Sequence, residues 1–230
     1  MYSIILINFS IFILEVFSLS GLILISLRLG KAAFIAFLSL LTITMNLFVV
    51  KQITLLGLYV TATDALAIGY LFGFNIFQEI FGKKEVTKAL FISLFLSLSF
   101  GLLSLFQLAY HASPLDAYSP VFIHLLLPYL RVFIASLLTF LIVQLFDITL
   151  FSLLRRKTGG RFLTLRVMLS LTLATFLDTT LFTLLGLFGL MEGLLQIAIF
   201  SIFVKLSAIF FYSLFAFFIK KVKFYETLSI

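Results

Sequence analysis

The chain has 230 residues, of which 63% are hydrophobic and only 11% are charged, and its mean hydropathy is +1.28. This composition excludes an ordinary soluble protein, which would precipitate with so much apolar surface. Cysteine is absent, so disulfides, thiolate metal sites and a cysteine nucleophile are excluded as well. The net charge of +7 does not indicate nucleic-acid binding, because the basic residues lie between apolar runs rather than on a soluble module.

Apolar runs bounded by charged and helix-breaking residues predict an all-α polytopic membrane bundle. In chain order, seven expected helices cover about residues 3–27, 31–50, 53–81, 88–110, 121–154, 163–190 and 193–219. We expect a single transmembrane domain, with 1–27 as an extra N-terminal helix and 31–220 as the core. The first run lacks a basic segment at its start and exceeds the apolar region of a signal peptide, so we expect it to be retained.

The basic residues predict the orientation of these spans. One side of the membrane receives thirteen of them and the other receives Lys51 alone. The thirteen are Arg28, Lys31, Lys83, Lys84, Lys88, Arg155, Arg156, Lys157, Arg161, Arg166, Lys220, Lys221 and Lys223. By the positive-inside rule, we expect a multi-pass protein of the cytoplasmic (inner) membrane with its N-terminus outside and its C-terminus in the cytoplasm.

Four ionisable residues lie deep inside the predicted spans: Asp64, Arg131, Asp178 and Lys205. Each is about 10 to 13 residues from the outer end of its span, which corresponds to a depth of roughly 15 to 20 Å. A charge at the centre of a membrane helix costs about 2.5–3.5 kcal/mol, so such residues usually serve a function. We predict that they meet in a polar pocket that binds a flat polar molecule. The alternative is two buried ion pairs that fix helix packing.

Other polar or small residues in the spans have mainly structural interpretations. Asn46 can present a donor and an acceptor to a heterocycle, or it can tie helices together. Gly69 and Gly73 predict close helix packing. Asp147 is interpreted as a structural anion near the inner interface, and Glu79 as the partner of the lysine four residues later.

Two stretches of the chain carry several recognisable motifs, ATDALAIGYLFGFNIFQEIFGKK (62–84) and RVFIASLLTFLIVQLFDITLFSLLRR (131–156). With the later helices, the motifs are Asp64 after Ala-Thr, Phe81-Gly82, Arg131 with Ala135-Ser136, Gln144 with Asp147, Asp178-Thr179 and Lys205. Together they resemble the queuosine precursor transporter family, also described as the vitamin uptake transporter family, over about residues 31–220.

The resemblance implies a carrier for 7-deazaguanine bases such as preQ0, preQ1 or queuine, with a core similar to the substrate-binding components of energy-coupling-factor vitamin transporters. It implies Asp64 and Asp178 as ligand-facing acids, and Arg131 and Lys205 as cations that keep them ionised or read the ring carbonyl. Asn46 and Gln144 complete the expected substrate-binding set.

The expected partners are a small deazapurine substrate and the lipid bilayer, without nucleic acid or a cofactor. Whether the chain forms a homodimer stays open. Two alternatives also stay open: a substrate-binding subunit of an ATP-driven vitamin transporter, and a structural membrane protein with buried ion pairs. An enzyme is not expected, because the aspartates lie among fixed cations and lack a lipid- or peptide-processing motif.

Overall fold

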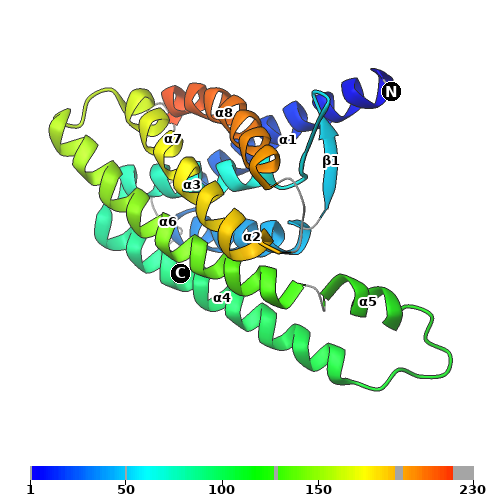
Figure 1. Cartoon of the computed structure of the whole chain (residues 1–230). Coiled ribbons are helices and arrows are strands. Elements are labelled where there is room, and N and C mark those ends of the chain that lie inside the picture. The colour runs from blue at the N-terminus through cyan, green and yellow to red at the C-terminus, as the bar shows by residue number, and fades with distance from the viewer. Residues whose placement is uncertain (1, 50, 127–128, 190–193, 220–230) are drawn as a thin grey trace.

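A computed structural model gives an all-α bundle with one short hairpin, and it describes residues 2–49, 51–126, 129–189 and 194–219 (Figure 1). The elements are α1 (Tyr2–Arg28), α2 (Lys31–Phe48), β1 (Gln52–Leu55), β2 (Leu58–Thr61), α3 (Asp64–Phe81), α4 (Lys83–Ala109), α5 (Ser119–Leu126), α6 (Tyr129–Lys157), α7 (Leu163–Phe182), the π-helical turn η1 (Thr183–Leu187) and α8 (Leu194–Ile219). Within the described ranges, six helices are long and apolar enough to span a membrane: α1, α2, α4, α6, α7 together with η1, and α8. The predicted multi-pass helical bundle is confirmed.

The third predicted span, residues 53–81, is wrong in its first part. Strands β1 and β2 form an antiparallel hairpin there, and α3 begins only at Asp64. Leu56 and Gly57 both have positive φ angles, 53° and 83°, as a two-residue hairpin turn requires. The Asn8 side chain on α1 donates a hydrogen bond of 2.8 Å to a backbone carbonyl of β1. The hairpin is therefore anchored to the bundle, and α3 follows directly after its second strand.

Other boundaries also differ from the expected spans. The fifth predicted span, 121–154, is two helices, α5 and α6, and α4 begins at Lys83 rather than near residue 88. Asp116 lies in the exposed loop before α5. Hydrogen bonds from the Ser119 hydroxyl and from the Tyr118 backbone N–H hold the pKa of this carboxyl below its usual range.

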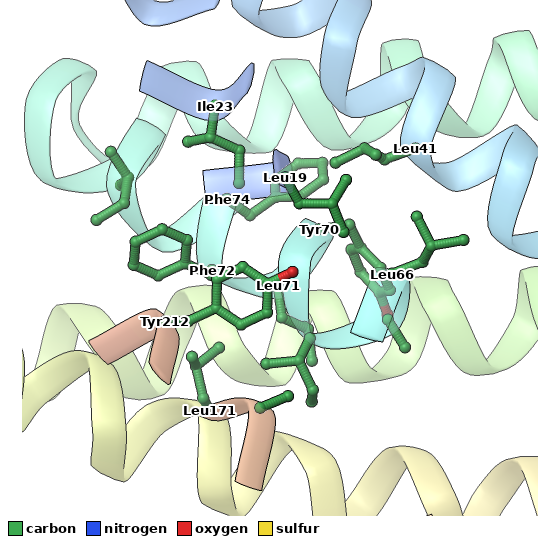
Figure 2. Packing of buried hydrophobic residues seen from close by; sticks show 14 of the residues in the cluster. Leu19, Ile23, Leu41, Leu66, Tyr70, Leu71, Phe72, Phe74, Leu171 and Tyr212 are labelled. Carbon is green, nitrogen blue, oxygen red and sulfur yellow. The ribbon is translucent and has the colours of Figure 1, made fainter. Parts of the chain in front are cut away.

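Helix α3 lies at the centre of the bundle. It contacts α1, α2, α4, α6, α7 and α8, and every residue from 64 to 78 is buried. Figure 2 shows Tyr70 and Phe72 of α3 among buried side chains of neighbouring helices. A Cβ atom on Gly69 would lie 2.8 Å from Tyr212 Oη, and one on Gly73 would lie 2.5 Å from Leu38 Cδ2. These distances agree with the packing interpretation of the glycine pair, which lets α8 and α2 approach α3 closely.

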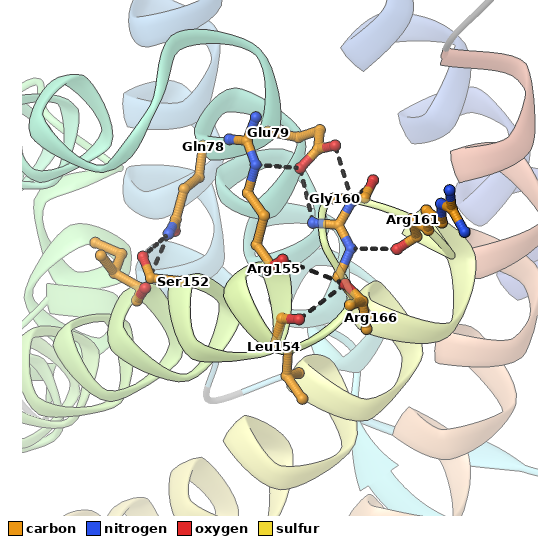
Figure 3. Close-up of polar contacts among 10 residues, drawn as sticks. Gln78, Glu79, Ser152, Leu154, Arg155, Gly160, Arg161 and Arg166 are labelled. Atoms are coloured by element: carbon orange, nitrogen blue, oxygen red, sulfur yellow. Dashed lines mark hydrogen bonds and ion pairs between the residues drawn. The ribbon is translucent and has the colours of Figure 1, made fainter.

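The basic end of the bundle is tied together by ion pairs. Lys31 at the start of α2 pairs with Glu85 on α4. Glu79 near the end of α3 accepts two hydrogen bonds of 2.8 Å from Arg166 on α7, and Arg155 on α6 lies 3.7 Å away (Figure 3). The predicted pairing of Glu79 with the lysine four residues later is wrong, because α3 ends at Phe81 and that lysine starts the next helix.

Candidate functional site

A cavity of about 600 Å³, including its open side, lies at the end of the bundle opposite these ion pairs. It is enclosed by the end of α2, β2, the start of α3, α6, the end of α7, η1 and the first half of α8. Its charged lining residues are Asp64, Asp178 and Lys205. The other polar lining residues carry hydroxyl groups: Thr61, Thr63, Tyr70, Ser136, Thr139, Thr179, Thr183 and Ser201. Three of the six predicted site residues therefore share one pocket.

Lys205 lies between the two acids of the pocket. Its Nζ atom is 2.9 Å from Asp178 Oδ2 and 3.8 Å from Asp64 Oδ1. Asp64 Oδ1 also accepts hydrogen bonds from Ser201 at 3.0 Å and from Thr61 at 3.2 Å. With all three groups ionised, two carboxylates and one ammonium give the pocket a net charge of −1. Such a pocket favours a cationic ligand or one rich in N–H donors.

The second carboxylate oxygen of Asp64 is an open acceptor. Asp64 Oδ2 and Thr139 Oγ1 are both buried and have no hydrogen-bond partner among the described residues. A buried polar atom without a partner costs about 1–3 kcal/mol, which a ligand donor at this position would offset. Asp64 occupies the first turn of α3 and not the middle of a span, and at this helix position the dipole stabilises a negative charge.

The other predicted site residues do not line this cavity in the described part of the chain. Asn46 is fully buried on α2, donates to the Thr42 carbonyl at 3.0 Å and accepts a hydrogen bond from Ser136, which does line the pocket. Gln144 is also fully buried, but it lies on α6 one helical turn beyond Phe140, the last residue of this helix that lines the pocket. Arg131 belongs to α6, and its side chain lies outside the described residues.

Sequence reasoning missed the aromatic walls of the pocket, Tyr70, Phe140 and Phe182. With 31 phenylalanines in the chain, no pattern singled these rings out. One missed residue did carry a signal. Ser201 precedes Lys205 by four residues and must therefore share its helix face.

A multi-pass bundle with a partly open, charged pocket in its interior has the architecture of a membrane transporter. The chain belongs to the family described as "Putative vitamin uptake transporter", which matches residues 65–219. It is also similar to a protein of Bacillus subtilis (strain 168) named "Probable queuosine precursor transporter", with 29% identity over 164 residues, 70% of this chain and 71% of the relative. No solved structure matches the chain. The resemblance seen in the motifs is confirmed.

Proposed function

We propose that this transporter imports 7-deazaguanine bases, the precursors of queuosine, through the pocket of Asp64, Asp178 and Lys205. The observation that carries the proposal is the pocket itself, which combines two acids, one bridging cation and an open carboxylate oxygen. Its walls combine aromatic side chains with a few polar groups that converge on one space, as is typical of small-molecule sites. The similarity to the Bacillus subtilis protein supports this choice of cargo.

The chemistry of the base matches the groups that line the pocket. The guanine-like edge has adjacent N–H donors, which the open oxygen of Asp64 can accept. Its flat ring system can lie against Tyr70 and Phe140, which line the same cavity. An aminomethyl substituent is cationic and offsets the net negative charge beside Asp178. Entry of such a cation into a cell gains about 2.3 kcal/mol per 100 mV of membrane potential, so import of a cationic base needs no ATP, whereas a neutral base gains nothing from the potential.

The first test is Asp178→Asn in cells that cannot make 7-deazaguanine bases. We expect initial uptake of a labelled base to fall by at least about tenfold, because the amide no longer supplies the negative charge that pairs with Lys205. The protein level in the membrane should be unchanged.

Asp116→Asn is the matched control, because it removes the same charge from an exposed loop. Wild-type uptake by Asp178→Asn would refute the assigned role. Purified protein in liposomes should carry the base without nucleotide. Uptake only with an added ATPase would instead identify a substrate-binding subunit.

We also propose that the pocket opens toward the outside and that the basic end of the bundle faces the cytoplasm, as the distribution of basic residues suggests. The chain has no cysteine, so single cysteines can test this directly. An impermeant maleimide should label Ser113→Cys in intact cells and Lys157→Cys only after permeabilisation. The reverse labelling pattern would overturn the orientation.

A further inference from the structure

A second buried polar cluster lies between α3 and α6, outside the pocket. It consists of Asn75 on α3 with Gln144 and Asp147 on α6, and all three side chains are 0% exposed. Ten buried side-chain atoms of the described residues lack a hydrogen-bond partner, and five of these ten belong to this cluster. They are both amide atoms of Asn75, both amide atoms of Gln144, and Asp147 Oδ2. Such a concentration of unmet hydrogen-bonding groups points to a ligand.

The packing of α3 against α6 places the three residues at a similar level along the bundle. The Phe140 ring lies 5.6 Å from Tyr70 and 6.2 Å from Phe74, and Gln78 donates at 2.8 Å to the backbone carbonyl eight residues after Phe140. Gln144 falls midway along α6 between these two contacts. The contacts on α3 run from Tyr70 and Phe74 to Gln78, and the middle of this stretch is near residue 75. Gln144 therefore lies level with Asn75.

Asp147 follows Gln144 by one helical turn, on the same face of α6. The Asn75 amide lies against the Asp147 carboxyl group without completing a hydrogen bond of good geometry. Ser170 on α7 donates to Asp147 Oδ1. In the described part of the chain, Asp147 has no ion-pair partner, so the cluster carries one negative charge when this carboxyl is ionised.

The unmet groups define the chemistry of the ligand. Two amides supply N–H donors and carbonyl acceptors, and the carboxyl supplies a further acceptor. A metal ion would satisfy the oxygens and leave both amide nitrogens without partners. A flat heterocycle whose edge carries both N–H groups and a carbonyl would satisfy donors and acceptors together.

The cluster continues the pocket along the bundle. Tyr70 and Phe140 line the pocket, and Asn75 and Gln144 follow them by five and four residues, about 6–8 Å further along their helices. The rings of Tyr70, Phe74 and Phe140 form the layer between the two sites. Tyr70 is within electrostatic reach of acids on both sides of this layer, Asp178 and Asp147.

We propose that Asn75, Gln144 and Asp147 form a second binding site, which receives the donor-and-acceptor edge of the base after it passes the aromatic layer. This inference rests on the proposed function and adds the route of the substrate to it. When Asp147 is ionised, a base with a cationic substituent meets a negative charge on each side of the aromatic layer.

The test compares 7-deazaguanine with 7-deazahypoxanthine, which lacks only the 2-amino group. In liposomes, wild-type protein should carry 7-deazaguanine at least about tenfold faster, because a site built to hydrogen-bond an N–H group rejects the analogue without it. In Asp147→Asn, this ratio should fall at least about threefold, and the preference that remains comes from Asp64, which accepts the same N–H groups in the pocket. Gln144→Leu should lower maximal uptake about tenfold while the Kd in detergent, set by the pocket, changes less than about threefold.

Ser97→Ala is the structural control. It removes a buried polar group on α4 that also lacks a partner among the described residues but is not part of the cluster, and it should not change the preference between the two bases.

If wild-type protein neither binds nor carries either base, the proposed function fails, and this inference fails with it. If it carries 7-deazaguanine while Asp147→Asn keeps the full preference, only the second site is refuted. If Asp147→Asn instead abolishes a Na⁺ dependence of uptake and keeps the preference, the cluster is an ion site and the inference is also overturned.

Discussion

Replacing Glu79 by alanine should lower the free energy of unfolding by about 3–5 kcal/mol, because it leaves Arg166 buried without a counter-charge. The Arg166 side chain is only 1% exposed, and both of its terminal nitrogens donate to Glu79. The guanidinium also lies 5.1 Å from the centre of the Phe151 ring, which holds it in place after the acid is removed. Thermal unfolding of the purified protein in detergent measures the effect.

Glu85→Ala is the control for this measurement. Glu85 pairs with Lys31 and Lys88 at an exposed position of α4, and the loss of such a pair should leave the melting temperature almost unchanged. The double variant Glu79→Leu with Arg166→Met should recover much of the lost stability, because no buried charge remains unpaired. Equal losses in Glu79→Ala and Glu85→Ala would show that the Glu79 pair does not stabilise the fold.

The second large effect is expected for Lys205→Met. This change removes the cation between Asp64 and Asp178, and it alters the net charge of the ionised pocket from −1 to −2. We expect uptake to be lost and the unfolding free energy to fall by several kcal/mol, since both carboxylates lose their pairing partner in a largely buried site. Uptake assays and thermal unfolding report the two effects separately.

A second substitution separates charge from packing at this position. Lys205→Met combined with Asp178→Asn restores a net charge of −1, so it should be more stable than Lys205→Met alone, although it should remain inactive. Lys205→Arg should be folded but impaired, because a planar guanidinium cannot replace a compact ammonium between two acids. If Lys205→Met transports normally, the bridging role of Lys205 is wrong.

The three charged residues of the pocket differ in how far their positions could be predicted from the sequence. Asp178 and Lys205 lie in long uninterrupted helices, so counting residues along a span placed them correctly beside each other. Asp64 also lies beside Lys205, but it does so at the start of α3 and not, as predicted, in the middle of a membrane span. The apolar, β-branched residues before it have the composition of a membrane helix, although they form a hairpin around Leu56 and Gly57. Composition alone does not separate these two outcomes.

Contacts between distant helices were less accessible to sequence reasoning. The interpretation of Asp147 as a structural anion near the inner interface overlooked that its side chain is fully buried against α3 and α7. The sequence alone does not predict a site at Asn75. A single amide in an apolar helix indicates a binding site only when polar residues of another helix are known to lie beside it. The assigned substrate-binding roles and the division between residues 1–27 and 31–220 stay predictions.

The central place of α3 has a consequence for how the protein is made. This helix carries Asp64, Asn75, Gln78 and Glu79, and it is shielded by helices on all sides. Three of those shielding helices are α6, α7 and α8, and α8 begins at Leu194, more than a hundred residues after α3 ends. While the ribosome is still translating the second half, the side of α3 that faces α6, α7 and α8 is not yet covered by protein. The insertion machinery must therefore keep this helix out of the lipid until the C-terminal helices emerge and close around it.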